Sequence, residues 1–458
     1  MRALPVLEQY GLSAKSGFLP AELPLSRLPD YFEPWESIVK DLPALIMTSN
    51  LRKLVDAMPL LDATRLNSEP EWHRACSILS FMAHGYVWSR PEASKKLPKC
   101  LAEPWIAVCD HFDLPPIASY AGLCLWNFRT VLPCDSPSNW NLENLAALTT
   151  YTGSMDEAWF YLVSTMIERQ GGPCLEHGLQ AIAASREKDV PTVVAKLQAL
   201  AENIDAIITT LNRMHETCDP HFFYFRLRPF LAGWKNMAAA GLPDGVVYGD
   251  EAQPRQYSGG SNAQSSLIQA LDILLNVVHH PEGERQPPRM ESKTADGVST
   301  PPPATFLLEM RKYMPVQHRK FLFDLEKVAE IRQFVVENAT EHPELVTAYD
   351  ACLAMLRNLR SRHIQIVTRY IIMPARAENK TIRDGIARDS GETGTGGTTL
   401  LPFLKQARDE VGDAAAGAWG RRLLSSAPPP NAKRMKTAGA SASEDRTAGS
   451  LNTATDHW

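Results

Sequence analysis

The 458-residue sequence lacks most of the short patterns that would define a protein class at once. Its eight cysteines form no CxxC pair, which argues against a zinc ribbon, a redox motif and a disulfide framework. No apolar run approaches the roughly 20 residues that span a bilayer. The first residues show no charged region followed by an apolar signal core. We therefore expect an intracellular, cytoplasmic protein without a membrane partner.

Basic charge and repeats are lacking as well. The formal net charge is −5, so no overall positive field would attract nucleic acid. No GxxxxGK[ST] phosphate loop occurs, and no period of 20–50 residues indicates a helical solenoid. The hydrophobic fraction of 44% is sufficient for a large core. The sequence thus favours a globular protein with no nucleic-acid partner.

Changes in composition along the chain predict its organisation. Residues 1–150 indicate a small, mainly helical domain with a Pro-rich start, and residues 151–410 a large helical domain. Residues 281–303 resemble a disordered insertion, and the polar, Gly-rich residues 376–399 a mobile lid. The Ala-, Ser-, Gly- and Thr-rich residues 411–458 predict a disordered tail.

The most informative stretch lies between Pro343 and Pro374 and has no internal Gly or Pro, so it predicts one amphipathic helix. At helical spacing its apolar face holds Tyr349, Cys352, Leu356, Leu359, Ile366, Val367 and Tyr370. His363 lies in the middle of this face. A histidine in such a place is more often a core residue satisfied by a neighbour. The other interpretation is an iron ligand beside an apolar wall that holds a flat cofactor. This helix alone does not decide between them.

A second helix is predicted from Ser154, where Ser-Met-Asp-Glu matches a capping box. We expect Gly171-Gly172 to end it. Ser164 follows Phe160 by one turn on the same face. A serine there is either tolerated in the helix or lines a pocket.

Two arginines stand within an aromatic segment that is otherwise suited to burial. Arg226 and Arg228 are two residues apart and point to different sides, so we expect only one to face inward. A buried arginine needs an anion, either a structural carboxylate, which is the commoner case, or the carboxylate of a ligand.

Another loop, Gly259-Gly260-Ser261, leads into a helix expected to start near Ser261 or Asn262. Such a start offers free N–H groups to a polar ligand, although Gly-Gly-Ser before a helix is commonplace. His279 and His280 are most simply explained by the helix dipole.

Several segments together are similar to the indoleamine 2,3-dioxygenase family. They are LPPIASYAGLCLWNF, FFYFRLRPFLAGWK, GVVYGD, GGSNAQSS, RKYMPVQHRKFL, LRSRHIQIVTRYI and GTGGTTLLPFLKQARDE. They occur in order over about residues 20–410, outside the 281–303 insertion and the tail.

The resemblance implies an all-α, two-domain fold with haem b between a large and a smaller helical domain. Because the chain has no CxxCH, this haem would be held without a covalent link. The resemblance also implies a ferrous active form and L-tryptophan and O2 as substrates. The implied product is N-formylkynurenine, the first intermediate of the kynurenine route to NAD. We expect a monomer that needs a cellular reductant only to keep its iron ferrous.

The resemblance also assigns roles to single residues. It matches His363 to the proximal haem-iron ligand. It matches the following residues to substrate binding: Arg228, Phe223, Phe160, Tyr120, Ser164 and the lid residue Thr395. It matches Gly260, Ser261 and Asn262 to the loop beside the haem. No protein group is assigned as a general base.

Some residues depart from the family pattern. Tyr224 and Pro229 differ from vertebrate-type members, and Asn262 replaces a small residue, which adds bulk beside the haem. Three hypotheses follow: a tryptophan dioxygenase, a related haem protein that binds O2 with little tryptophan turnover, and a haem-free helical interaction module. Retention of Arg228 and Phe223 favours the first, and Asn262 keeps the second open.

Overall fold

The computed structural model describes residues 2–133, 139–285, 305–376 and 400–424. All of these residues fall in one compact unit. Most of the predicted insertion and lid, with Thr395, lies outside the described residues, as does the tail beyond residue 424.

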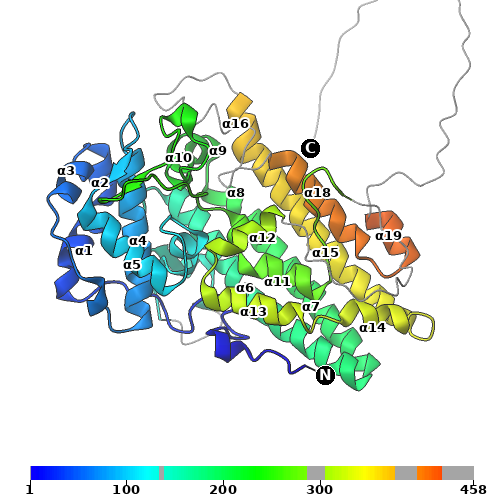
Figure 1. Ribbon diagram of the computed structural model, residues 1–458. Helices are drawn as coiled ribbons and strands as arrows, with labels where there is room; N and C mark the ends of the chain where they lie inside the picture. Colours follow the sequence, from blue (N-terminus) through cyan, green and yellow to red (C-terminus); the bar gives the residue numbers. More distant parts are fainter. Residues whose placement is uncertain (1, 134–138, 286–304, 377–399, 425–458) are drawn as a thin grey trace, which may run out of the picture. The chain divides into compact units, whose positions relative to one another are not determined.

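The described part of the chain is mainly helical, which confirms the all-α class (Figure 1). The α-helices are α1 (Glu33–Lys40), α2 (Leu42–Met47), α3 (Leu51–Asp56), α4 (Glu69–Trp88), α5 (Lys99–His111), α6 (Met155–Glu187), α7 (Val190–Asn212), α8 (Met214–Thr217), α9 (Pro220–Phe222), α10 (Arg228–Leu231), α11 (Ser266–Leu274), α12 (Phe306–Met310), α13 (Val316–Glu326), α14 (Ile331–Glu337), α15 (Pro343–Val367), α16 (Met373–Arg376), α18 (Leu400–Asp413) and α19 (Ala418–Leu424). No helix within these ranges is both long and apolar enough to cross a membrane.

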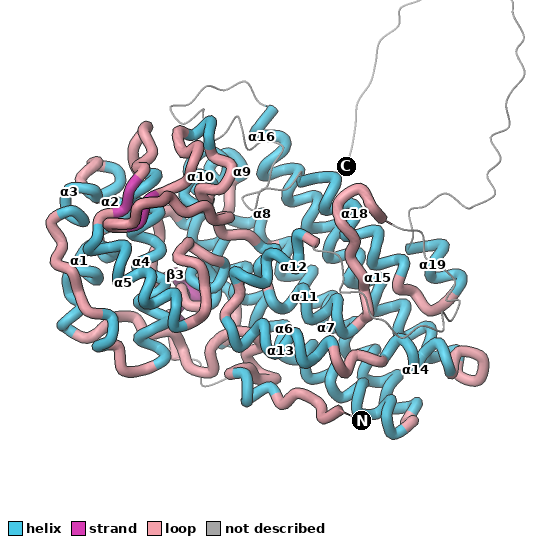
Figure 2. The backbone as a smooth tube through the Cα atoms, in the orientation of Figure 1, coloured by secondary structure: helices cyan, strands magenta, loops and turns pink. Residues whose placement is uncertain are grey.

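Strands are few and short (Figure 2). Strand β1 (Lys96–Leu97) pairs in parallel with β4 (Val247–Tyr248). Strand β2 (Phe128–Thr130) pairs in antiparallel fashion with β3 (Leu145–Ala147), with Phe128 opposite Ala147. The 3₁₀ segments are η1 (Leu7–Tyr10), η2 (Asp30–Phe32), η3 (Ala63–Arg65), η6 (Leu142–Asn144), η8 (Ala238–Ala240), η9 (Asn262–Gln264) and η10 (Arg311–Tyr313). The two strand pairs join loops and do not form a core sheet.

Two hydrophobic cores hold the helices together. The first gathers aromatic side chains such as Trp35, Trp105 and Trp234 around α4 and α5. The second lies among α6, α7 and α15, where α7 packs between α6 and α15 and α18 packs on α15 (Figure 1). The first core takes residues from both sides of residue 150, so the cores do not separate the chain at that position. The domain boundary near residue 150 therefore stays a prediction.

Helix α6 does not end at Gly171-Gly172, so that expectation is wrong. It continues to Glu187 and includes Pro173. A Cβ at Gly172 would lie 2.5 Å from the carbonyl oxygen of Ala14, and one at Gly171 would lie 2.4 Å from Leu267 Cδ1. The glycines therefore allow other segments to approach the middle of α6. Because those segments are distant in the sequence, the residues around Gly171-Gly172 do not reveal this role.

The predicted tail also starts too early. Residues 411–424 form the end of α18, a short turn and α19, and Asp350 on α15 accepts hydrogen bonds from the backbone N–H groups of Ala416 (2.8 Å) and Gly417 (3.1 Å) in the turn. Arg285, inside the predicted insertion, forms an ion pair with Asp413 at 2.8 Å. These contacts order segments whose composition alone indicated disorder.

Candidate functional site

A cavity lies among α6, α15, α18 and the glycine-rich loop before α11. Its wall is largely apolar, with a few polar groups that point to a specific ligand. The lining residues are Tyr120, Leu123, Cys124, Phe160, Ser164, Ile167, Leu211, Met214, Phe223, Arg228, Leu231, Gly260, Ser261, Asn262, Ala263, Ser265, Ile268, Phe306, Leu307, Leu356, Leu359, Arg360, His363, Ile366, Val367, Tyr370, Ile371, Leu400, Phe403 and Leu404.

Each π-helical segment of the described chain contributes to this cavity. These segments are η4 (Ala121–Leu125), η7 (Phe223–Leu227) and η11 (Thr368–Ile372). They supply Leu123 and Cys124, Phe223, and Tyr370 and Ile371 respectively. A π turn inserts an extra residue into a helix and is frequent at functional sites, so the backbone marks the cavity independently of the side chains.

His363 faces the cavity from the apolar side of α15. It retains accessible surface although protein atoms enclose it, because its ring borders the open space. Burial, with a smaller contribution from the charge of Arg360, lowers the pKa of His363 to about 4. Its imidazole is therefore neutral at physiological pH, and a neutral ring nitrogen is what metal binding requires.

The alternative of a core histidine satisfied by a neighbour finds no support in the hydrogen bonds of the described residues, since none of them involves the His363 ring. In the same residues, no cluster of three His, Cys, Asp or Glu could hold a metal ion. A porphyrin supplies the in-plane ligands itself, so one histidine suffices to bind haem iron. The neutral His363 ring and the apolar wall fit such a group.

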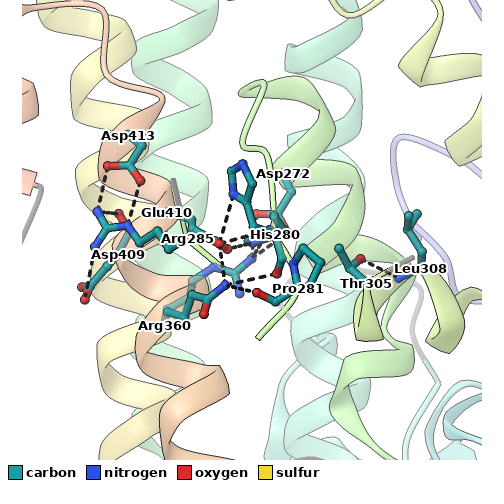
Figure 3. Close-up of polar contacts among 12 residues, drawn as sticks. Asp272, His280, Pro281, Arg285, Thr305, Leu308, Arg360, Asp409, Glu410 and Asp413 are labelled. Atoms are coloured by element: carbon teal, nitrogen blue, oxygen red, sulfur yellow. Dashed lines mark hydrogen bonds and ion pairs between the residues drawn. The ribbon is translucent and has the colours of Figure 1, made fainter. Parts of the chain in front are cut away.

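Behind His363, one turn earlier on α15, Arg360 reaches Asp272 on α11 (Figure 3). Its Nη2 donates to both carboxylate oxygens, at 2.6 and 2.7 Å. His279 lies between two carboxylates, with Nε2 3.1 Å from Asp272 and Nδ1 2.6 Å from Glu410 on α18. This network joins α11, α15 and α18, three elements that line the cavity.

The charges of this network support one another. Burial disfavours charge on all three groups, yet Arg360 and His279 hold the pKa of Asp272 below its usual value, and His279 lowers that of Glu410. The two carboxylates in turn raise the pKa of His279. The explanation of His279 and His280 by a helix dipole is therefore wrong: α11 ends at Leu274, and carboxylates bind both histidines.

Three aromatic rings pack together in the cavity wall. The centroids of Phe160 on α6 and Phe223 on η7 are 4.9 Å apart with their planes at 50°. Phe223 also contacts Tyr370 edge to face, at 5.8 Å. The Tyr370 hydroxyl donates to the carbonyl of Cys218 at 2.6 Å, which fixes this ring. Together they form a rigid surface for a flat apolar ligand.

As expected, only one of the two arginines faces inward. Arg228 is buried and lines the cavity, whereas Arg226 is exposed. The Arg228 guanidinium lies 5.3 Å from the centroid of Tyr224. Burial lowers the pKa of Arg228 to about 10, so it remains charged at neutral pH. A buried cation at a cavity wall favours an anionic ligand group.

The glycine loop approaches the cavity closely. A Cβ at Gly260 would lie 2.6 Å from Leu123 Cδ1, so a larger residue would displace this wall. Ser261 caps the 3₁₀ segment Asn262–Gln264, and α11 itself starts at Ser266 with Ser265 as its N-cap. The helix was therefore expected a few residues too early. The Asn262 side chain belongs to the cavity lining, where the sequence predicted added bulk.

Every expected site residue within the described ranges lines this cavity, and Thr395 lies outside those ranges. The sequence reasoning missed Cys124, Phe403, Arg360 and Glu168, of which Glu168 lies behind the wall. Helical spacing could have indicated two of them: Arg360 precedes His363 by one turn, and Glu168 follows Ser164 by one turn.

An all-helical fold around a largely apolar cavity, with a neutral histidine and a buried arginine in its lining, suits the binding of a large flat cofactor and an anionic ligand. The sequence profile of the family described as IDO, indoleamine 2,3-dioxygenase, matches residues 6–414. The chain belongs to the indoleamine 2,3-dioxygenase family, and it is an enzyme of the dioxygenase type.

Among its relatives, the indoleamine 2,3-dioxygenase of Saccharomyces cerevisiae is 44% identical over 437 residues, which cover 90% of this chain and 94% of the relative. Indoleamine 2,3-dioxygenase qulI of Penicillium citrinum is 38% identical, with 88% of each chain covered. The 6-hydroxytryptophan 2,3-dioxygenase fscD of Fusarium equiseti is 34% identical, covering 88% of this chain and 96% of the relative. The matches span nearly the whole length of these proteins.

Proposed function

We propose that this dioxygenase inserts both atoms of O2 across the indole C2–C3 bond of L-tryptophan, giving N-formylkynurenine, with haem b as its cofactor. The observation that carries the proposal is the convergence of His363, Arg228 and the aromatic pair Phe160 and Phe223 on one cavity. We further propose a cytoplasmic monomer that starts the kynurenine route. Its cellular reductant would serve only to keep the iron ferrous, because both oxygen atoms end in the product.

The residues that would hold the cofactor are His363 on one side and the Gly260–Asn262 loop at the edge. When bound, ferrous haem supplies the oxygen chemistry, with His363 as the protein's iron ligand. The network of Asp272, Arg360 and His279 fixes α15 behind this ligand. A ligand fixed in this way keeps its orientation without relying on the cofactor alone.

The chain's own contribution to the reaction is orientation. Phe160, Phe223 and Tyr120 supply the walls for the indole ring, and Arg228 binds the substrate carboxylate. Holding two reactants in one geometry converts a bimolecular step into an effectively unimolecular one. The apolar wall excludes water, which strengthens the Arg228–carboxylate contact. Ser164, whose hydroxyl donates to the carbonyl of Phe160 at 3.3 Å, is a polar lining group and needs no role as a base.

One spectral time course tests this function. The protein is loaded with haem, reduced and mixed with O2 and L-tryptophan, while the haem band and N-formylkynurenine absorbance are followed together. We expect product to form while the haem band cycles. A stable O2 complex without product would favour the O2-binding family protein, with Asn262 in the cavity lining as its structural reason. A protein with no haem band would contradict the assignment of His363 and favour the haem-free module.

The substrate within this class is tested by competition. Since one relative is named for 6-hydroxytryptophan, the two amino acids are supplied in equal amounts and both formylated products are quantified. We expect L-tryptophan to react with the higher kcat/KM, because the cavity wall beside Phe160 and Phe223 is apolar. A preference for the hydroxylated substrate would contradict this choice.

A further inference from the structure

A buried carboxyl group lies directly behind the cavity wall. Glu168 follows Phe160 and Ser164 on α6 at four-residue intervals, so it continues the helix face that lines the cavity. Its side chain is 0% exposed, and it is not itself a lining residue. Its backbone is held as well, because Gly17 packs against the Glu168 carbonyl so closely that a Cβ there would lie 2.5 Å from the oxygen.

One oxygen of Glu168 joins three parts of the wall. Oε1 accepts hydrogen bonds from the Tyr120 hydroxyl at 3.0 Å and from the Ser265 hydroxyl at 2.5 Å. Tyr120 immediately precedes η4, and Ser265 is the N-cap of α11. Both residues line the cavity. Glu168 therefore ties α6, η4 and α11 together at the place where they meet.

The other oxygen, Oε2, has no hydrogen-bond partner among the described residues. No Lys, Arg or His in those residues forms an ion pair with Glu168. Its titratable neighbours are Tyr120 and Cys124 on or beside η4, and burial keeps both neutral by raising their pKa values. The groups contributed by α6 and α11, Ser164 and Ser265, do not titrate. An ionised Glu168 would thus place an uncompensated charge in a dry region.

We propose that Glu168 is a positioning residue that carries a proton in the resting enzyme, fixes Tyr120 and Ser265 in the cavity wall, and lowers the reduction potential of the cofactor when it ionises. Negative charge near haem stabilises the ferric form over the ferrous form, because it attracts the more positive iron more strongly. Ionisation would therefore shift the enzyme away from its active oxidation state. The redox part rests on the proposed function, whereas the protonation part does not.

Burial raises the pKa of Glu168 to about 7, while the hydrogen bonds from Ser265 and Tyr120 oppose this increase. The ionisation therefore falls in the physiological range. An isolated carboxyl would be ionised throughout that range.

The experiment compares the full-length wild type with Glu168→Gln, which keeps the acceptor at Oε1 and cannot ionise. Glu157→Gln is the matched control: Glu157 is another fully buried glutamate of α6, and it binds Tyr151, Thr152 and Tyr161, outside the cavity lining. The infrared C=O band of protonated carboxyl groups is followed against pH without haem. The ferric–ferrous midpoint potential is then measured against pH in the haem-loaded proteins.

We expect a carboxylic-acid band that disappears through neutral pH in the wild type and in Glu157→Gln, and that is missing in Glu168→Gln. We also expect the potential of the wild type to fall below that of Glu168→Gln as the pH rises, with the two equal in acid. Equal bands in wild type and Glu168→Gln, or parallel potentials at every pH, would overturn the proposal.

A second variant covers the case in which Glu168→Gln does not fold. Tyr120→Phe removes one donor from Oε1 and so destabilises the ionised form, which should move the loss of the infrared band to higher pH. An unmoved midpoint would count against the proposal. A protein that binds no haem would contradict the proposed function. The infrared measurement needs no haem, so it would still decide whether Glu168 carries a proton.

Discussion

Arg360 and His363 lie one turn apart on α15, and within the described parts of the chain only Arg360 of the two forms an ion pair. Arg360 donates to both oxygens of Asp272 through one nitrogen, while the neutral ring of His363 faces the cavity. Arg360 thus anchors α15 to α11, and His363 faces the cavity.

Replacing His363 by Ala should abolish the Soret band of the haem-loaded protein, because the substitution removes the iron ligand. Absorption spectra after haem titration measure the effect. His342→Ala is the control, since His342 occupies the N-cap position of the same helix and its side chain pairs with the nearby Glu344. Added imidazole should restore part of the band in His363→Ala. Normal haem binding without imidazole would exclude His363 as the ligand.

Replacing Arg228 by Ala should raise the KM for L-tryptophan and leave haem content unchanged. A hydrogen bond to a charged group contributes about 1.5–3 kcal/mol, which corresponds to roughly a ten- to hundredfold change. Arg228→Lys should recover only part of this loss, because an ammonium group lacks the planar geometry of guanidinium. The exposed neighbour provides the comparison: Arg226→Ala should keep the wild-type KM. An unchanged KM in Arg228→Ala would refute the assignment.

Replacing His279 by Gln should destabilise the protein, most strongly below the pKa of His279. The folded-state pKa of His279 is raised, so its contribution is complete below the pKa of an unfolded histidine and is lost as pH rises through the folded value. The pKa values of Asp272 and Glu410 are lowered, so their contribution is lost as pH falls through the folded values. The network is therefore strongest between these two limits.

Melting temperatures of wild type and His279→Gln measured against pH give the result. The free energy of unfolding derived from these melts should be lower in His279→Gln by up to about 3–5 kcal/mol at weakly acidic pH, as for other broken buried ion pairs. This difference in free energy should become smaller at basic pH. His342→Gln, at a far more exposed histidine, should follow the wild-type curve. A difference that grows with pH would have the wrong sign for this mechanism.

Replacing Gly172 by Ala should destabilise the contact between α6 and the N-terminal residues 14–17. Alanine would favour the helix by about 1 kcal/mol. Its Cβ would meet backbone atoms of Ala14 and Gly17 within 2.5–2.9 Å, however, and backbone cannot move aside as a flexible side chain can. Overpacking of this kind costs about 1–3 kcal/mol, so the net change should be a loss. Urea unfolding measures it.

Gly122→Ala serves as the comparison for Gly172, because the nearest atom to its new Cβ would be 3.7 Å away, at ordinary contact distance. It should therefore change the free energy of unfolding little. Equal stability of Gly172→Ala and wild type would show that the N-terminal segment moves away at no cost.

Sequence patterns within one helix predicted the parts of the site that depend on neighbouring residues alone. The apolar face of α15, with His363 in it, follows from helical spacing, and the separation of Arg226 from Arg228 follows from their positions two residues apart. The length of α6 was mispredicted, because its glycines are explained by Ala14 and Leu267, which are distant in the sequence. The same holds for His279, whose second carboxylate lies 131 residues further along the chain.

The three π-helical segments make the site dependent on residue number as well as residue identity. Each contains one residue more than an α-helix needs for the same length, and each extra residue turns the following side chains by about 100°. Deletion of a single residue from positions 224–227, none of which lines the cavity, would restore a regular helix and rotate Arg228 away from the cavity. Substitution scans would not reveal this dependence, whereas single-residue deletions would.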